Sequence, residues 1–232
     1  MHPMRPWIAG TPLLLAACGG GSISLPRPTA YEPATEPAAA AWAGSTAPEE
    51  ARDIRFRWTI RDDRGSAGGR GRVRVAVPDS ARLDVRGPLG SGNGAAFVNG
   101  DTALWAEPEE DVRRLVPNYP IFWALMGVAR GPVAGSSVRR SAAGESVTAW
   151  RYVRGADTTD YVMVPGPPRR LLLEAREAGT TVGTVETRFG PDGRPASARL
   201  IVPGVPARLD LTFYSNEKAQ PFAPDTWTPP EP

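Results

Sequence analysis

The chain has 232 residues, 41% of them hydrophobic, with 27 Lys and Arg against 25 Asp and Glu. This length suits one domain with a tail, and the nearly balanced charge gives no indication of a nucleic-acid partner. The only histidine is His2 and the only cysteine is Cys18, so processing of the first segment removes both types from the rest of the chain. Their absence excludes Ser–His–Asp and Cys–His catalysis, zinc sites of the usual kind and disulfides. We therefore expect no enzyme activity, no catalytic residues, no metal and no cofactor.

Residues 1–17 form a predicted signal peptide, with Arg5 in its positive start and a short apolar stretch after it. That stretch is far shorter than the roughly 20 residues that cross a bilayer as a helix. Leu15-Ala16-Ala17-Cys18 resembles the bacterial lipobox, which implies a lipid anchor on Cys18; the alternative is a plain signal peptide with an incidental cysteine. Gly19 and Gly20 follow in place of the Asp that the familiar sorting rule associates with the inner membrane. We expect an outer-membrane protein that faces the periplasm.

Residues 18–48 are predicted to be the lipidated cysteine and a tether. Gly19–Pro48 is rich in Gly, Pro and Ala, a composition that buries too little apolar surface to offset the entropy of ordering. About 30 residues of flexible chain span roughly 30 Å, which lifts a domain away from lipid headgroups. An alternative is that Glu36–Ala51 forms an amphipathic helix docked on the domain. Residues 49–232 are the predicted folded domain.

Apolar and polar residues alternate with a period of two from Ala51 onward, which indicates half-buried β-strands. Asp63–Gly69 is predicted to be a turn, and the later connections are also rich in Gly and Pro. No crossover helices separate the strands, so the pattern excludes a doubly wound sheet and favours an antiparallel meander. The eleven expected strands cover 54–61, 72–77, 82–86, 94–99, 102–106, 146–154, 159–164, 169–178, 180–189, 195–202 and 207–215.

The segment Glu107–Arg130 interrupts this pattern with two predicted short helices. Acidic residues at Glu109–Asp111 suit the start of the first helix, and Pro120 suits the start of the second. The second helix is apolar almost all round and must therefore be buried. The concave face of a curled sheet is the simplest place for it.

Several short motifs resemble the LolB-type lipoprotein acceptors of the outer membrane. The first three are Arg86-Gly87-Pro88-Leu89-Gly90-Ser91 after the third strand, Pro120–Leu125 with Gly127 and Pro132, and Trp150-Arg151-Tyr152. The carboxyl-terminal segment is similar to that of related LolB-like domains of unknown function, with Asn216, Pro221, Phe222, Asp225 and Trp227. The resemblance spans residue 52 to about 230. It implies a mainly β fold, an incomplete antiparallel barrel of about eleven strands with a helical lid or plug over an apolar cavity on its concave face. The strand count agrees with this fold independently.

The resemblance also implies a function. An apolar groove stabilises bound acyl chains by about 0.8 kcal/mol per buried CH₂. We expect an outer-membrane lipoprotein that accepts or carries acylated cargo, lipoprotein or lipid, from a periplasmic carrier protein for membrane insertion. The alternative is a non-carrier envelope lipoprotein that uses the fold as a protein-interaction or sensing module; an envelope hydrolase has the least support. An open cavity favours the carrier, and a barrel filled by its own side chains favours the interaction module.

The candidate site residues follow from these expectations. Leu89 matches the exposed leucine implicated in cargo delivery in the family; the alternative is an ordinary turn residue on the sheet edge. The inward-facing apolar residues are expected to form the hydrophobic core, and lining a ligand cavity is their second possible role. The helix residues form either a mobile lid or a plug. The candidate cavity and lid residues are Ile54, Phe56, Trp58, Val75, Leu83, Phe97, Leu104, Phe122, Trp123, Leu125, Met126, Leu209, Leu211 and Phe213.

Two charged groups have less specific interpretations. One is a row of arginines that either meets anionic lipid headgroups or is a solvated sheet face: Arg55, Arg57, Arg61, Arg72 and Arg74. The other is the acidic group of Glu107 and Glu109–Asp111. Glycosidase chemistry needs two carboxylates that face each other across a bond, so these acids fit helix caps better.

Overall fold

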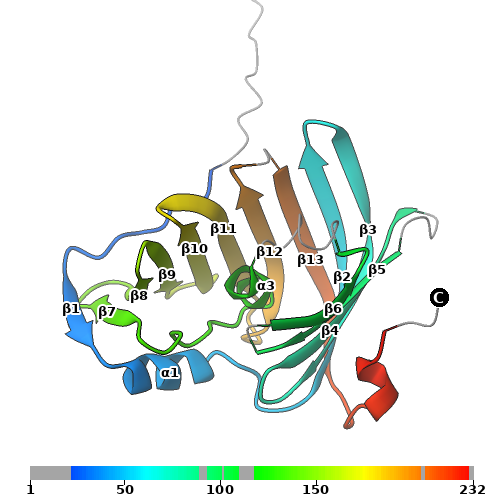
Figure 1. The fold of residues 1–232 in the computed structure, drawn as a ribbon, viewed down its shortest axis with the longest axis horizontal. Helices are drawn as coiled ribbons and strands as arrows, with labels where there is room; N and C mark the ends of the chain where they lie inside the picture. Colours follow the sequence, from blue (N-terminus) through cyan, green and yellow to red (C-terminus); the bar gives the residue numbers. More distant parts are fainter. Residues whose placement is uncertain (1–21, 89–92, 101, 110–117, 205–206, 230–232) are drawn as a thin grey trace, which may run out of the picture.

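The computed structural model describes residues 22–88, 93–100, 102–109, 118–204 and 207–229. Its strands form one antiparallel sheet that curls without closing (Figure 1), which confirms the predicted fold class. The strand order is β1-β7-β8-β9-β10-β11-β12-β13-β2-β3-β4-β5-β6. The strands are β1 Tyr31–Ala34, β2 Arg52–Asp62, β3 Gly65–Ala76, β4 Ser80–Arg86, β5 Asn93–Asn99, β6 Thr102–Glu107, β7 Ser137–Ser141, β8 Thr148–Arg154, β9 Asp157–Val164, β10 Arg170–Glu177, β11 Thr180–Phe189, β12 Pro195–Val202 and β13 Ala207–Lys218.

Three described helical segments accompany the sheet: α1 Glu36–Gly44, α3 Tyr119–Leu125 and the 3₁₀ turn η2 Pro224–Trp227. The helix α3 lies within the curve of the sheet, and α1 lies beside β7 (Figure 1). The first predicted mid-chain helix falls largely on residues 110–117, outside the described residues. Cys18 and Leu89 also lie outside them.

The sheet joins two runs of consecutive strands through one long-range pairing. The first run extends from β2 to β6, and the second from β7 to β13, with β1 added at its free edge. Arg52 of β2 pairs with Lys218 of β13, and the two strands run antiparallel along their full length. The last strand, β13, therefore joins the run from β7 to β12 to the run from β2 to β6.

The segment expected to be a tether contributes two elements to this domain. Tyr31–Ala34 pairs with β7, and the helix Glu36–Gly44 corresponds to the docked-helix alternative. Ala39 and Ala43 are fully or almost fully buried because small side chains let the helix approach the core closely. Regular secondary structure thus begins at Tyr31, within the segment expected from composition to be a tether.

The hairpin between β2 and β3 is longer than predicted. Residues 65–69, expected to be turn, already belong to β3. Gly69 pairs with Trp58, and a Cβ at Gly69 would lie 2.9 Å from the Trp58 ring. The glycines of this strand therefore make room for large side chains on β2, a use that glycine has within strands.

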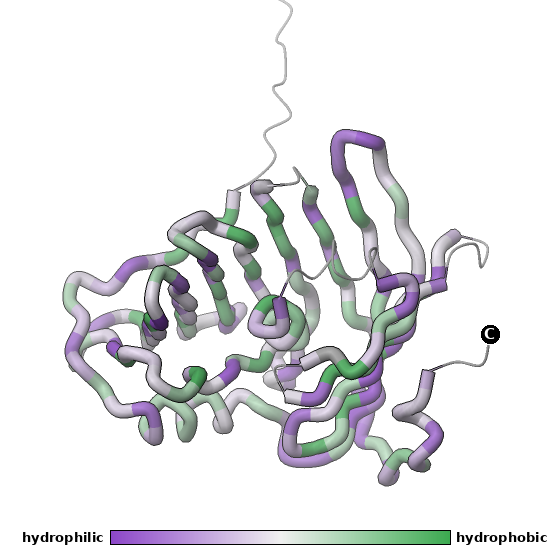
Figure 2. The backbone as a smooth tube through the Cα atoms, viewed as in Figure 1, coloured by the Kyte–Doolittle hydropathy of each residue, from purple (hydrophilic) through white to green (hydrophobic). Residues whose placement is uncertain are grey.

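Hydrophobic residues alternate with hydrophilic ones along the strands (Figure 2), and most of the buried ones form a core on the concave side. A smaller cluster lies on the opposite face of β8 to β10, around Ala149, Val162 and Leu172. Ile23 and Leu25, from the start of the described chain, pack against this second cluster. The sheet is therefore covered on both faces in this region.

Candidate functional site

The concave face is built from apolar side chains brought into line by the strand register. Ile54 of β2 pairs with Val73 of β3, which pairs with Leu83 of β4 on its other side. Paired residues in antiparallel strands project to the same face, so alternate positions form continuous apolar rows. Five of the predicted wall residues are buried, namely Ile54, Phe56, Val75, Leu209 and Leu211, and three are partly buried against them, namely Trp58, Leu83 and Phe213.

Two predicted wall residues do not lie on this face. Phe97 pairs with Arg82, on the outer face, and its ring lies 5.2 Å from that of Trp227 in η2. Leu104 is 58% exposed and is skipped in the pairing of β5 with β6, where the register shifts between Phe97 and Val98. The irregularity breaks the period of two, and this is why alternation placed Leu104 wrongly.

The helix α3 covers part of the concave face, as predicted. Its amino end is capped by Asn118, whose Oδ1 accepts a hydrogen bond from the Ile121 backbone N–H at 3.0 Å, and Pro120 stands in its first turn. The helix contacts β10, β11 and β12. The four predicted lid residues, Phe122, Trp123, Leu125 and Met126, are all buried.

Few polar contacts hold α3 to the sheet. The Thr187 hydroxyl donates to the carbonyl of Ala124 at 2.6 Å, and the Trp123 indole N–H donates to the carbonyl of Gly100 at 2.9 Å. Gly183 lies directly beneath the helix, and a Cβ there would come within 2.4 Å of Ile121 Cδ1. Beyond the helix, Gly127 has a φ of +80°, a left-handed conformation that favours glycine. The contact is thus close, but it is mostly apolar.

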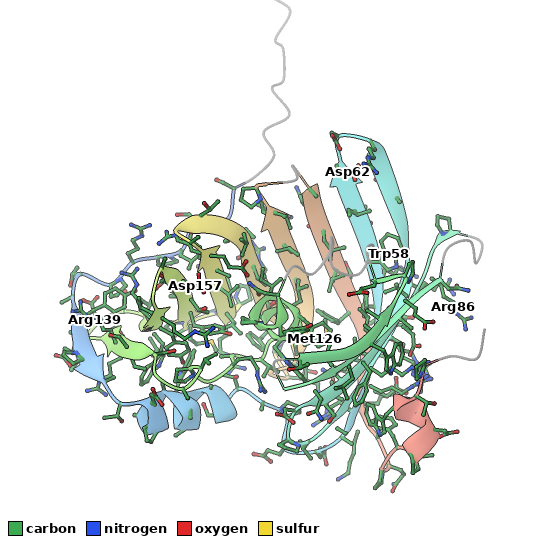
Figure 3. The ribbon with its side chains drawn as sticks, in the orientation of Figure 1. Trp58, Asp62, Arg86, Met126, Arg139 and Asp157 are labelled. Carbon is green, nitrogen blue, oxygen red and sulfur yellow. The ribbon has the colours of Figure 1, made fainter. Side chains whose placement is uncertain are left out.

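A cavity of about 510 Å³ opens at the carboxyl end of α3. Met126 (Figure 3) lies on its wall, together with residues from α1, β2, β3, β9, β11, β12 and β13. The larger apolar members of its wall are Trp42, Ile54, Val75, Met126, Val128, Met163 and Phe189. A volume of this size falls within the ~300–1,000 Å³ typical of small-molecule sites.

Three arginines also line this cavity: Arg52, Arg169 and Arg194. The guanidinium of Arg169 stacks on the ring of Phe189 at 4.3 Å, and Nη1 of Arg194 donates to the carbonyl of Asn216 at 2.9 Å. Arg52 Nη1 and Asn216 Oδ1 are buried without a hydrogen-bond partner among the described residues. Buried polar atoms are normally paired, so this cavity offers polar groups to a ligand as well as an apolar wall.

A smaller cavity of about 200 Å³ lies at the amino end of α3, lined in part by Tyr119, Tyr152 and Tyr161. The Tyr161 hydroxyl accepts a hydrogen bond from the Arg130 backbone N–H at 3.1 Å. The Tyr152 hydroxyl is buried without a hydrogen-bond partner among the described groups, and burial raises its pKa. The helix α3 therefore has a cavity at each end.

The described residues contain no group of His, Cys, Asp and Glu arranged to hold a metal ion. Among the helices of the described ranges, none has the length and apolar character needed to cross a membrane. What the site combines is an apolar concave face, a short apolar helix and cavities with polar atoms at both ends of that helix.

No family model and no curated protein matches the chain. Solved structures do match it. A LolA superfamily protein from Nitrosomonas europaea has a TM-score of 0.55 at 11% identity, covering 84% of this chain and 98% of the other. A domain from Vibrio parahaemolyticus, described as that of an outer membrane lipoprotein-sorting protein, has a TM-score of 0.50 at 10% identity, covering 82% and 94%. The chain therefore has a LolA/LolB-like fold, and the likeness does not single out the LolB branch.

Proposed function

We propose that the protein binds the acyl chain of a lipid or lipoprotein in its concave interior and delivers it to a membrane. The observation that carries the proposal is the cavity of about 510 Å³ at the end of α3, with an apolar wall and three arginines. An acyl chain buried there gains about 0.8 kcal/mol per CH₂. The arginines suit a carboxylate or phosphate at the polar end of such a ligand.

The helix α3 serves as the lid in this proposal. It covers the concave face with apolar side chains and with few hydrogen bonds to the sheet, so its displacement costs little specific polar bonding. A displaced lid joins the two cavities into one groove. Loading and release then need no covalent chemistry, only a membrane in which the acyl chain is more stable than in the groove.

The proposed setting is the bacterial envelope. The protein is anchored through lipid on Cys18, faces the periplasm from the outer membrane, and receives its cargo from a periplasmic carrier protein. Leu89 inserts into the membrane during delivery. The solved structures with the same fold include a lipoprotein-sorting domain, which supports this setting by analogy alone.

A second candidate function is a protein-interaction or sensing module. It is favoured by the burial of all five residues from Ile121 to Leu125, which fill the middle of the concave face. In that case α3 is a permanent plug and the cavities at its ends bind nothing.

Native mass spectrometry of the full chain carrying Cys18→Ser separates these candidates. We expect one acylated molecule per chain, either co-purified or taken up from added palmitic acid. The variant Arg169→Gln/Arg194→Gln is expected to bind palmitic acid at least about tenfold more weakly while binding palmitic acid methyl ester equally, because only the acid carries the charge that these residues recognise. A protein that takes up neither fatty acid nor lipopeptide supports the plug.

A further inference from the structure

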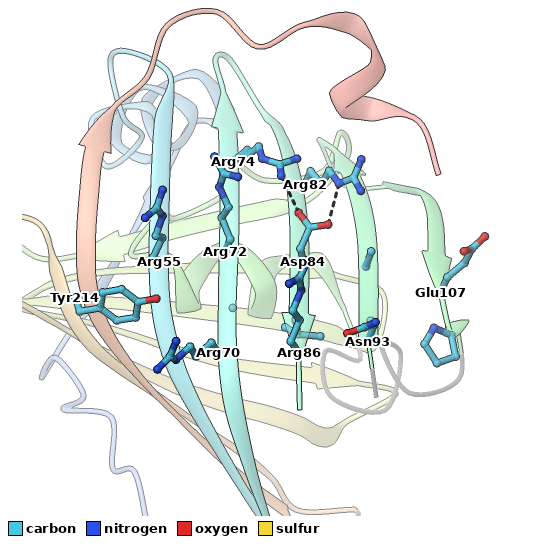
Figure 4. Close-up of a pocket in the computed structure, with 15 residues that line it drawn as sticks. Arg55, Arg70, Arg72, Arg74, Arg82, Asp84, Arg86, Asn93, Glu107 and Tyr214 are labelled. Atoms are coloured by element: carbon cyan, nitrogen blue, oxygen red, sulfur yellow. Dashed lines mark hydrogen bonds and ion pairs between the residues drawn. The ribbon is translucent and has the colours of Figure 1, made fainter. Parts of the chain in front are cut away.

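The outer face of β2 to β5 carries arginines in register. Arg57, Arg70 and Arg86 stand opposite one another on three adjacent strands, a set that we call the arginine row. A neighbouring row contains Arg55, Arg72 and Asp84. Figure 4 shows Arg70 and Arg86 of the first row and all three members of the second around a hollow of about 850 Å³. Six arginines line the hollow, against the two acidic residues Asp84 and Glu107.

The arginines at one end of the hollow have carboxylate partners. Arg72 Nε donates to Asp53 at 2.9 Å, while Asp84 lies 3.6 Å from Arg74 and 3.0 Å from Arg82. Arg82 also donates to the backbone carbonyl of Thr226, which holds the carboxyl-terminal segment against the sheet. These arginines have a structural role that explains their presence.

The arginine row has no such structural role. No ion pair joins Arg57, Arg70 or Arg86 to a carboxylate within the part of the chain that the structure describes. The guanidinium of Arg57 lies over the ring of Tyr214, 5.9 Å from its centre. Like charges directly opposite each other destabilise a sheet. A bound anion removes that repulsion.

We propose that this hollow binds a phosphate group. Guanidinium groups recognise phosphate through paired hydrogen bonds, and a phosphate has enough oxygens and charge to bridge arginines on neighbouring strands. A carboxylate, with two oxygens and a single charge, compensates less of the charge of such a row than a phosphate does. Arg70 and Arg86 are the principal ligands, with Asn93, the next residue in the same row, and Arg55 beside them.

The hollow lies on the face of the sheet opposite the concave cavity, so this proposal is independent of the acyl-chain function. The phosphate has two sources with the same chemistry: a small soluble phosphate ester, or the headgroup of an anionic phospholipid. In the second case the hollow would hold the sheet against a membrane surface.

The test uses the full chain carrying Cys18→Ser and follows binding in two arms. Calorimetry with glycerol 3-phosphate probes the soluble source. Co-sedimentation with phosphatidylcholine vesicles, with and without phosphatidylglycerol, probes the headgroup. In whichever arm the parent protein binds, we expect Arg70→Gln/Arg86→Gln to weaken binding at least about tenfold.

The matched control removes the same charge elsewhere. Arg139 and Arg154 are exposed, and Arg139 lies at the opposite end of the molecule from Arg86 (Figure 3). Arg139→Gln/Arg154→Gln should leave binding within about twofold of the parent, since salt screens charges at that distance. Binding in the soluble arm assigns a phosphate ester, and binding only to phosphatidylglycerol vesicles assigns a headgroup. Absence of binding in both arms, or an equal loss in the control, overturns the proposal.

Discussion

The two ends of the sheet are built differently. Strands β8 to β10 are covered on both faces, by the concave core on one side and by Ile23 and Leu25 on the other. Strands β2 to β5 share the same core, but their outer face carries arginines around a hollow. Strands β8 to β10, which we call the platform, are thus held by apolar contacts on both faces. Strands β2 to β5 expose positive charge on their outer face. The comparison teaches that the strands that support α3 and the strands that form the outer arginine hollow are separate parts of one sheet.

The strongest test of the lid role is to fix α3 to β11, the strand beneath it. A Cβ at Gly183 would lie 3.5 Å from Ile121 Cγ1, close enough for Ile121→Cys/Gly183→Cys to form a disulfide in the Cys18→Ser background. If α3 is a lid, oxidation abolishes uptake of a fluorescent fatty acid and reduction restores it. The two single-cysteine variants are controls and should not respond to oxidation. Equal uptake in both redox states would show that α3 need not move.

The next largest effect concerns stability. Leu173, on β10, is fully buried, and Leu173→Ala should lower the free energy of unfolding by about 2–5 kcal/mol, because it leaves a cavity in the platform. Leu104→Ala, at an exposed position on β6, should change it by no more than about 0.5 kcal/mol. Urea denaturation measures both. Similar losses would contradict the placement of these two leucines.

Acid should weaken the ion-paired strands next. Burial alone would raise the pKa of Asp210, but hydrogen bonds from Arg208 and Arg199 outweigh burial and lower it. A carboxylate with a lowered pKa in the folded state stabilises the protein above its unfolded pKa, and this contribution is lost as the pH falls through the folded pKa. We therefore expect stability to fall below about pH 4, and Asp210→Asn should make that fall shallower. An unchanged pH profile of thermal unfolding would contradict this account.

The smallest expected effect tests whether α1 belongs to the folded domain. The Thr35 hydroxyl accepts a hydrogen bond from the Ala38 backbone N–H at 3.4 Å and caps the helix. Thr35→Ala should cost about 1 kcal/mol of unfolding free energy. If residues before 49 were an independent tether, the same substitution would leave the unfolding midpoint unchanged.

Strand alternation predicted most of this fold. The period of two located eleven strands because one face of each is buried, and the apolar stretch at Tyr119–Leu125 predicted a buried helix. The two missed strands are short, and one contains Pro33 while the other contains Arg139 and Arg140, so neither shows the alternation. β1 has β7 as its partner strand, over a sequence separation that local pattern cannot bridge, whereas β7 also pairs with β8.

The candidate sites were less predictable. The burial of Phe122 and Trp123 follows from their apolar character, but the cavity beside Met126 depends on where the helix stops relative to α1 and strands from both runs of the sheet. The arginines were visible in the sequence, whereas the lack of carboxylates opposite Arg70 and Arg86 depends on register across three strands. Turn lengths set that register, and Gly65 starts β3 earlier than its composition indicated. Lipidation of Cys18 and delivery through Leu89 stay predictions.

The pairing of β2 with β13 has a consequence for the order in which the chain folds. Residues 52 and 218 must meet, so β2 cannot gain its neighbour on that side until nearly all of the domain has been synthesised. Contacts this distant in sequence slow folding, because the entropy of closing the loop is lost before the pairing stabilises it. During that interval β2 and β12 both present unpaired backbone edges to other chains. Folding of this protein is therefore expected to depend on protection from aggregation until its last strand arrives.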